Sequence, residues 1–296
     1  MKTMIFPNGG RRLRFARDLL RILREDRSAA IGGVIIVVFC VVAVIGPSVT
    51  SVGVAPDPSQ AYRGPSGRFP LGTDGFGHSI LSEIIIGTRP IMEVGVAAAI
   101  MTVAVGVIVG LISGYLAGAA DAVIMRVVDV FLTIPGLPLI LVIAAVIRTS
   151  NPLVLAAVLS IQGWAGLARP VRSMALSLRS ADFIEAARGQ AVPLRHMVGR
   201  QLLPNVGPYV AIHFLIAVTA AIYAEVGLFL LGVAPLSGTN WGIMINTAIG
   251  QGALYSSDSA MTLLSPMIAI VLLQFGFVLF SRAMDDLFNP RMRVLA

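Results

Sequence analysis

The sequence predicts an all-α polytopic membrane protein that crosses the bilayer six times. Hydrophobic residues make up 56% of its 296 residues and charged residues only 12%, whereas about 25% of the residues of an average soluble domain are charged. Six apolar segments are each long enough to cross a hydrocarbon core of ~30 Å, which requires about 20 helical residues. A transmembrane β-barrel would instead show alternating segments of about ten residues, so we expect no membrane-spanning strands.

The six predicted spans begin after a basic, amphipathic stretch at residues 1–28, which is expected to lie on anionic lipid of the inner leaflet. The spans are 29–46, 92–117, 127–147, 152–168, 207–233 and 261–280. The first apolar run is longer than the about 7–15 residues of a signal-peptide core, so we expect an uncleaved anchor. Residues 47–91 form an external loop rich in Pro, Gly and Ser, and residues 284–296 form a cytoplasmic tail.

Four glycines follow one another at intervals of four in the second span, at Gly106, Gly110, Gly114 and Gly118. Residues at this spacing lie on one face of a helix. Small side chains on such a face allow a neighbouring helix to approach closely. The pattern therefore predicts a helix-packing surface, and a hinge that bends during transport is the alternative.

Prolines shape the third and fourth spans. Pro135 and Pro138 lie inside the third span, where a missing backbone donor is expected to kink the helix. Such a kink is either a gate or a simple bend. Pro152 leads into the fourth span, and proline suits the first turn of a helix.

Three carboxylates lie within the apolar spans. Asp129 is predicted to pair with Arg126, three residues earlier on the same helix face. An ionisable side chain at membrane depth usually faces a bundle interior or a wet cavity. Glu93 and Glu225 are therefore candidates for a polar pathway, with structural pairing or interfacial exposure as the alternative.

The distribution of positive charge predicts the orientation of the chain. With the N-terminus in the cytoplasm, 18 of the 22 Lys and Arg residues are cytoplasmic, and only Arg63, Arg68, Arg89 and Arg148 fall outside. Cytoplasmic loops carry such an excess of positive residues, so both termini and the loop 169–206 are predicted to be cytoplasmic. The formal net charge of +7 follows from this topology, and no nucleic-acid partner is expected.

The motifs of an ATPase or of another enzyme do not occur in this sequence. A phosphate-binding loop of the form GxxxxGK[ST] needs a lysine, and the single lysine, Lys2, lies in no such loop. Cys40 is the one cysteine, and His78, His196 and His213 are scattered without the spacing of metal ligands. We therefore predict no catalytic residue, no metal site and no cofactor in this chain.

A basic, amphipathic insert, SADFIEAARGQAVPLRHMVGRQLLPN, separates the fourth and fifth spans at residues 180–205. Ser180 or Asp182 is expected to cap a short helix through FIEAARG. Phe183 and Ala187 would share one face of this helix.

Two prolines divide the rest of the insert. Pro193 breaks the chain before a second basic helix, LRHMVGRQLL, which Pro204 is expected to end. The insert would then lie across the membrane plane with a span attached at each end. A displacement of the insert would therefore be passed to these two spans. Its charge alone would equally allow it to rest on the inner leaflet.

The insert resembles the cytoplasmic EAA loop of the integral membrane permeases of ABC importers. Its motif residues are Glu185, Ala186 and Ala187, followed by Leu202, Leu203 and Pro204. Further blocks extend the resemblance over most of the chain from residue 27 onward: FPLGTDGFGHSILSEIIIGTRPIMEVG, MRVVDVFLTIPGLPLIL, WAGLARPVRSMALSLRSADFIEAAR, NWGIM and DDLFNPRMR. Together they are similar to the C-type permease subunits of the dipeptide, oligopeptide and nickel family.

This resemblance implies a type I ABC importer permease fold, with a core at 92–283 and a cytoplasmic coupling helix in the loop 169–206. The coupling helix would dock into a groove on an ATPase subunit. Glu185 would meet basic groups there, Phe183 and Ala187 would fill the groove, and Arg179 and Arg188 would support the loop. The full set of implied coupling residues is Arg179, Asp182, Phe183, Glu185, Ala186, Ala187 and Arg188.

The resemblance also implies partners and a location. The expected partners are a second homologous permease subunit, two cytoplasmic ATPase subunits that bind ATP and Mg, an external substrate-binding protein, and membrane lipid. The chain would be a multi-pass protein of a bacterial or archaeal plasma membrane. Peptides are the implied solute, and an oligosaccharide or a nickel chelate is the alternative.

Several positions depart from the family pattern. Ala191 stands where the EAA loop usually has glycine, and His78 and Ser79 stand where the subfamily usually has Arg and Asp. An ion-coupled secondary transporter is the alternative class of function. Such transporters typically show internal repeats and ionisable residues at the membrane midplane, and this sequence shows no clear repeat.

Overall fold

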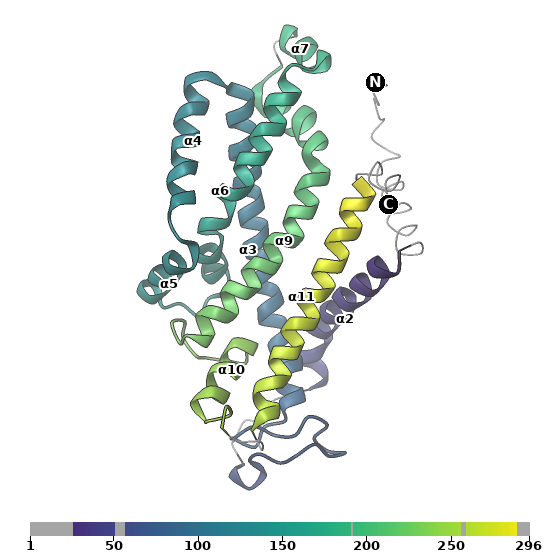
Figure 1. The fold of residues 1–296 in the computed structure, drawn as a ribbon, viewed down its shortest axis with the longest axis vertical. Coiled ribbons are helices and arrows are strands. Elements are labelled where there is room, and N and C mark those ends of the chain that lie inside the picture. The colour runs from purple at the N-terminus through teal and green to yellow at the C-terminus, as the bar shows by residue number, and fades with distance from the viewer. Residues whose placement is uncertain (1–25, 51–56, 191, 256–258, 289–296) are drawn as a thin grey trace.

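The computed structural model describes residues 26–50, 57–190, 192–255 and 259–288, and it is built from helices (Figure 1). The helices are α2 (Arg27–Val49), α3 (Ile80–Leu116), α4 (Gly118–Thr133), α5 (Gly136–Ile147), α6 (Pro152–Arg179), α7 (Asp182–Gly189), α8 (Leu194–His196), α9 (Leu203–Leu230), α10 (Trp241–Gly250) and α11 (Ala260–Phe288), with a 3-10 turn at Pro58–Gln60 and a π-helical turn, η2, at Met197–Leu202. Most of the predicted segments 1–28 and 284–296, and Ala191, lie outside the described residues.

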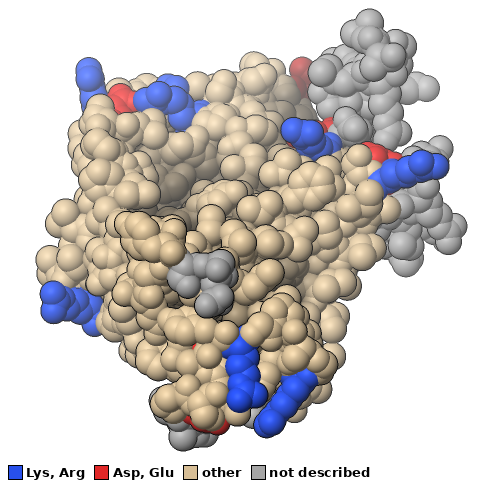
Figure 2. Space-filling view, turned by 60° about the horizontal axis from the view of Figure 1, so that its bottom comes forward, with Lys and Arg blue, Asp and Glu red and all other residues tan. Residues whose placement is uncertain are grey.

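The all-α polytopic prediction is confirmed for the described part of the chain. Five helical stretches are long and apolar enough to cross a membrane, and there are six if the bent pair α4 and α5 counts as one span. Valine, isoleucine and leucine side chains are exposed along α2, α4 and α11. In Figure 2 the charged side chains lie in a few small groups on a surface that is mostly uncharged. So large an exposed apolar surface is unusual for a soluble monomer and suits contact with lipid.

Several helices extend beyond the predicted borders. α3 begins at Ile80 instead of residue 92, so the loop predicted to be external ends at Ser79, whose hydroxyl caps the helix by accepting from the Ser82 amide at 3.5 Å. α6 continues past residue 168 to Arg179. Its last turns form a helix because Val171 and Ala175 bury one face, although the opposite face is polar.

The glycines of α3 pack against α6, which confirms the packing prediction for three of the four positions. A Cβ added to Gly110 would lie 2.6 Å from the Ala168 carbonyl oxygen, and one added to Gly114 would lie 2.6 Å from Cβ of Ala175. Gly106 meets α6 in the same way. Only a residue without a side chain allows the backbones to approach this closely.

Gly118 has a different role from the other three glycines. It begins α4 with a positive φ of 65°, directly after Ala117, which also has a positive φ of 52°. Glycine adopts this left-handed conformation at little cost. The two residues reverse the chain between α3 and α4.

The third predicted span is two helices and not one kinked helix. α4 and α5 meet at an angle of 85°, and Pro135 is the residue before α5. The predicted proline break is therefore confirmed at Pro135, where it is a sharp turn between two helices and not a kink within one. Pro138 lies in the first turn of α5, where a missing N–H leaves no helical hydrogen bond unmade.

Pro204 does not end a helix, so that prediction is wrong. α8, η2 and α9 run without interruption from Leu194 to Leu230. Pro204 lies in the first turn of α9, directly after the π-helical turn. Proline inside a regular α-helix collides with the carbonyl four residues earlier. The wider π-helical turn moves that carbonyl and accommodates the ring.

α10 is an additional helix near the end of the molecule opposite α7 (Figure 1). Trp241, at its start, is fully buried. The indole N–H donates to the Ile84 carbonyl oxygen at 3.1 Å, and the ring makes an edge contact with Phe39 at 5.7 Å between centroids. Trp241 thereby joins α10 to α3 and α2.

The α3–α6 contact generates a stability prediction. Gly110→Ala should lower the thermal stability of the purified protein in detergent, because the new methyl group overlaps the Ala168 carbonyl and overpacking costs roughly 1–3 kcal/mol. Gly227→Ala is the matched control, since a Cβ at this helical position has open space and alanine favours the helix by up to about 1 kcal/mol. Equal melting temperatures for the two variants would contradict the close packing.

Candidate functional site

A buried ion pair fixes the end of the molecule from which α7 projects. Arg172 of α6 donates from Nε and Nη2 to the two carboxylate oxygens of Asp121 in α4. The Ser113 hydroxyl of α3 donates to the same carboxylate. The Asp121 side chain is only 9% exposed. A bidentate pair of this kind is strong and directional, and it joins three helices two turns before α6 ends.

A second ion pair links α4 to α6 on the surface. Asp129 accepts from Arg169 at 2.6 Å, and both side chains are about half exposed. The predicted pairing of Asp129 with Arg126 is therefore wrong. The helix-spacing argument considered only neighbours within α4, and the adjacent α6 supplies the partner instead.

The helix α7 is attached to the rest of the chain by one apolar face. Ile184 is fully buried and Ala187 is 8% exposed. Both belong to a hydrophobic cluster with residues of α3, α6, η2 and α9, among them Val171, Ala175, Met197, Leu202 and Val206. The short helix is therefore packed on these four elements and is not a free loop.

The opposite face of α7 points away from the protein. Asp182, Glu185 and Ala186 are exposed, and Phe183 is 38% exposed although its side chain is large and apolar. The expectation that Ala187 shares this outward face is wrong. Ala187 follows Ile184 by three residues, so both lie on the face that packs inward.

The remaining residues implied for this site lie around the start of α7. Arg179 is the last residue of α6 and is partly buried. Ser180 is the residue after α6, and its hydroxyl donates to the Ser177 carbonyl at 3.2 Å. The Ser180 hydroxyl therefore bonds to the last turn of α6. Asp182 is the first residue of α7. The side chain of Arg188 lies outside those that the structure describes.

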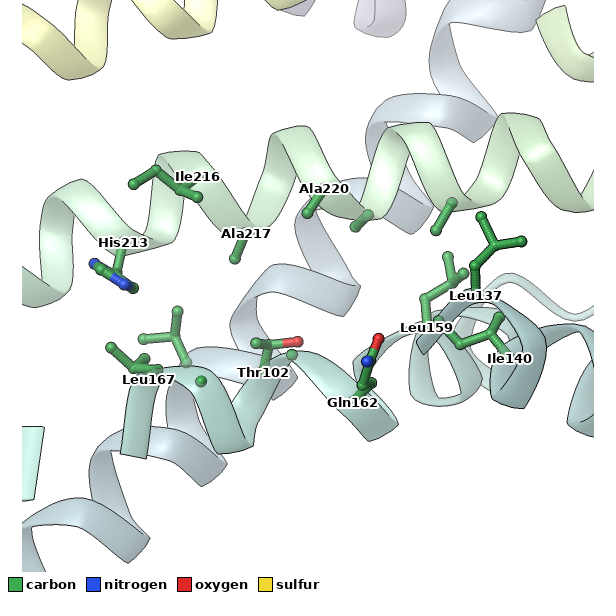
Figure 3. Close-up of a pocket in the computed structure, with 15 residues that line it drawn as sticks. Thr102, Leu137, Ile140, Leu159, Gln162, Leu167, His213, Ile216, Ala217 and Ala220 are labelled. Carbon is green, nitrogen blue, oxygen red and sulfur yellow. The ribbon is translucent and has the colours of Figure 1, made fainter. Parts of the chain in front are cut away.

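A cavity of about 380 Å³ lies between α3, α5, α6 and α9. Figure 3 shows that aliphatic side chains surround three polar ones, Thr102, Gln162 and His213. His213 Nδ1 is buried without a hydrogen-bond partner. Gln162 Nε2 lies 3.4 Å from the Ile134 carbonyl oxygen, next to the break before α5. Ligand sites are typically apolar cavities with a few polar groups.

Sequence reasoning missed these three polar residues. Each stands alone among apolar neighbours in its own helix, and only the packing of four helices brings them around one cavity. An isolated polar residue in an otherwise apolar span is the signal from which they could have been selected.

A further cavity of about 370 Å³ lies near the other end of the bundle and includes Glu225, Asn240 and Arg89 in its wall. Glu225 is fully buried, and its Oε1 accepts from Asn240 Nδ2 at 2.8 Å. Its Oε2 has no hydrogen-bond partner. Glu93 forms an ion pair with Arg89 at 2.7 Å, with both side chains about half exposed. The structure therefore brings Glu225 to this cavity, and the Glu93–Arg89 pair lies on the wall of a separate, more open pocket of about 760 Å³ beside α2.

Comparison with known proteins identifies what the chain is similar to. Residues 106–294 match the family described as binding-protein-dependent transport system inner membrane component. Residues 14–65 match the N-terminal transmembrane domain of oligopeptide transport permease C.

Three curated relatives illustrate the similarity. The dipeptide transport system permease protein DppC of Alkalihalophilus pseudofirmus is 29% identical, over 94% of this chain and 90% of the relative. The oligopeptide transport system permease protein OppC of Bacillus subtilis is 27% identical over the same shares. A putative peptide permease protein of Brucella suis is 32% identical, over 77% of this chain and 74% of the relative.

The two ion pairs of α6 should differ in their contribution to stability. Arg172→Gln leaves the buried Asp121 carboxylate without its cation, which costs roughly 3–5 kcal/mol. Arg169→Gln removes an exposed pair worth about 0–1 kcal/mol. Thermal unfolding of the two purified variants measures the difference. A loss of stability in Arg169→Gln as large as in Arg172→Gln would contradict the assigned burial.

Proposed function

Because the chain belongs to the family of binding-protein-dependent transport system inner membrane components, we propose that it is a permease subunit of an ATP-driven importer and forms half of its translocation pathway. The exposed face of α7 carries this proposal. The Phe183 ring, the Glu185 carboxylate and Ala186 face outward on this helix, and its other face is packed on its own chain. A surface of this kind suits contact with another protein.

The same helix would couple the permease to separate ATPase subunits. In this proposal Glu185 meets basic groups of the ATPase, Phe183 enters its groove, and Ala186 allows close approach of the two surfaces. Ala187 and Ile184 do not contact the partner, and instead they attach α7 to its own chain. ATP and Mg would be bound by the partner subunits, since the sequence has no phosphate-binding loop of its own.

The hydrophobic cluster under α7 supports the transfer of a displacement of α7 to the rest of the chain. It joins α7 to α6 and to the continuous stretch of η2 and α9. α6 and α9 are also two of the four helices around the cavity with Gln162 and His213. A displacement of α7 would therefore reach both helices. The π-helical turn is a point at which α9 can adjust, because such turns hold an extra residue within the helix.

Peptides are the proposed solute, and the names of the relatives support them. The same machinery with an oligosaccharide or a nickel chelate is the alternative. An external substrate-binding protein would deliver the solute, and a second homologous permease would complete the pathway. An ion-coupled secondary transporter, the alternative class, would have no use for an outward-facing α7 and would show no ATPase partner.

Charge reversal at Glu185 tests the proposed coupling. In the assembled complex with its ATPase subunits and binding protein, Glu185→Arg should abolish peptide-stimulated ATP hydrolysis, because like charges at an interface cost several kcal/mol. Membrane insertion should be unchanged, since Glu185 is exposed. Asp285→Arg, at an exposed position near the end of α11, is the matched control. Stimulated hydrolysis at the wild-type rate in Glu185→Arg would exclude this role.

Two neighbouring residues separate docking from folding. Phe183→Ala should weaken capture of the ATPase subunits by roughly 1–3 kcal/mol, as for an interface anchor, with little change in the melting temperature of the isolated chain. Ile184→Ala should instead lower that melting temperature, because truncation of a buried isoleucine costs about 2–5 kcal/mol. Copurification and thermal unfolding of both variants give the two measurements. Weaker capture for Ile184→Ala, together with a lower melting temperature for Phe183→Ala, would show that α7 presents the opposite face to the ATPase.

A further inference from the structure

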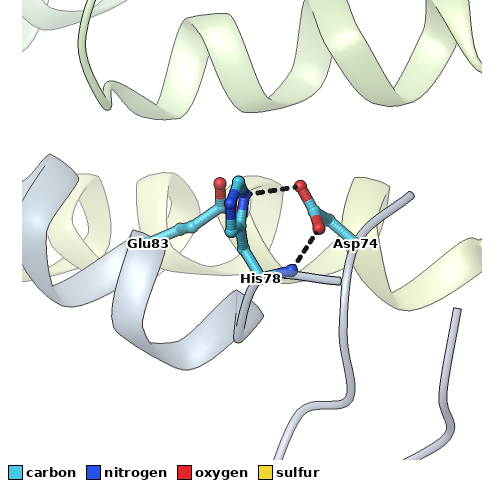
Figure 4. Close-up of side chains that lie close together, drawn as sticks. All are labelled: Asp74, His78 and Glu83. Atoms are coloured by element: carbon cyan, nitrogen blue, oxygen red, sulfur yellow. Dashed lines mark hydrogen bonds and ion pairs between the residues drawn. The ribbon is translucent and has the colours of Figure 1, made fainter. Parts of the chain in front are cut away.

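Three side chains of types that bind metal ions meet where the external loop enters α3. Asp74 and His78 come from the loop, and Glu83 comes from the first turn of α3 (Figure 4). One ligand atom from each lies within 4.8 Å of the other two. The histidine spacing in the sequence predicted no metal site, because the two acidic partners are brought in by a tight turn and not by a regular motif.

The distance between Asp74 and His78 suits two ligands of one metal ion. Nδ1 of His78 lies 3.5 Å from Oδ2 of Asp74. A charge-assisted hydrogen bond would be shorter, at about 2.7–2.9 Å. Two atoms that each lie about 2.0–2.1 Å from a tetrahedral Zn²⁺ are separated by roughly 3.3–3.5 Å. The third ligand, Glu83, has a flexible side chain that can close the remaining gap.

The loop holds Asp74 in a fixed orientation. Its Oδ1 accepts from the backbone N–H groups of Phe76 at 3.0 Å and His78 at 2.7 Å. An isolated antiparallel bridge between Thr73 and Ser79 closes the turn. With Oδ1 occupied, Oδ2 is the oxygen that faces the His78 ring, as Figure 4 shows. Supporting hydrogen bonds of this kind orient the ligands of metal sites.

The three side chains have unused bonding capacity. The Glu83 carboxylate forms no hydrogen bond or ion pair with a described residue, and Oδ2 of Asp74 has only the His78 ring nearby, at 3.5 Å. Two carboxylates therefore lie within 4.8 Å of each other with no lysine or arginine paired to either among the described residues. Such a pair of like charges is unfavourable. A divalent cation would remove the repulsion.

We propose that Asp74, His78 and Glu83 form a binding site for a divalent transition-metal ion of the Zn²⁺ type. One imidazole and two carboxylates are ligands that Zn²⁺ accepts, with water in the fourth position. Ca²⁺ and Mg²⁺ prefer six or more oxygen ligands, so the imidazole selects against them. The bound ion would fasten the external loop to the start of α3. The proposal is independent of the solute and of the ATPase coupling.

Zn²⁺ titration of the purified full-length chain tests the site. After removal of metal with a chelator, the wild-type protein should bind one Zn²⁺ per chain and should melt at a higher temperature with Zn²⁺ than with Mg²⁺ or Ca²⁺. His78→Asn and Glu83→Gln should each weaken Zn²⁺ binding at least about 10–100-fold, the loss that even a supporting residue of a metal site causes. Equilibrium dialysis with metal analysis measures both effects.

Two control variants match the changes in chemistry. Glu93→Gln removes a carboxylate from the same helix, and His196→Asn removes a histidine elsewhere, and both should bind Zn²⁺ like the wild type. His78→Cys should restore binding, because thiolate is also a Zn²⁺ ligand. The absence of saturable Zn²⁺ binding by the wild type would overturn the proposal, whatever the stability of the variants. So would unchanged binding in both His78→Asn and Glu83→Gln.

Discussion

The close approach of α3 and α6 is the contact on which the rest of this molecule depends. Between lipid and protein there is no aqueous driving force for helix association, so close packing of small residues supplies much of the attraction. The glycines of α3 place its backbone against carbonyl groups of α6. The buried Asp121–Arg172 pair then holds α4 against the same two helices. Consequently α6 emerges from the bundle in a fixed direction, and α7 is presented at its end.

Polar groups are distributed in this bundle according to how well they are paired. In the bidentate Asp121–Arg172 pair the carboxylate is buried and the guanidinium partly buried, whereas Arg169–Asp129 and Arg89–Glu93 are about half exposed. Glu225 and His213 differ from all of these: Glu225 is fully buried and His213 is partly buried, and each has one buried polar atom without a hydrogen-bond partner. An incompletely paired polar group at membrane depth is costly and is a common mark of a functional cavity. The two cavities that these residues line are therefore where a polar solute would find binding partners.

The helical fold and the proline break could be predicted from composition and local pattern, because both depend on residues close in sequence. The partners of individual side chains could not. The glycine spacing of α3 predicted a packing face but not that α6 covers it. Asp129 has a candidate partner within its own helix, yet the arginine of a neighbouring helix takes that place. Ala187 could face either way until Ile184, buried beneath α7, shows which side packs inward.

The attachment of α7 also determines how force can pass through the chain. A helix joined by flexible loops alone would move without effect, because slack in the loops would absorb the displacement. Here Ile184 and Ala187 are packed with side chains of α6, η2 and α9, and well-packed interiors are nearly incompressible. Movement of α7 therefore requires α6 and α9 to move or to repack together. Their middle turns line the cavity beside Gln162, where the chain is broken before α5. The break lets α5 change its angle to α4 without loss of helical hydrogen bonds, so the wall of that cavity is the part of the bundle best able to yield.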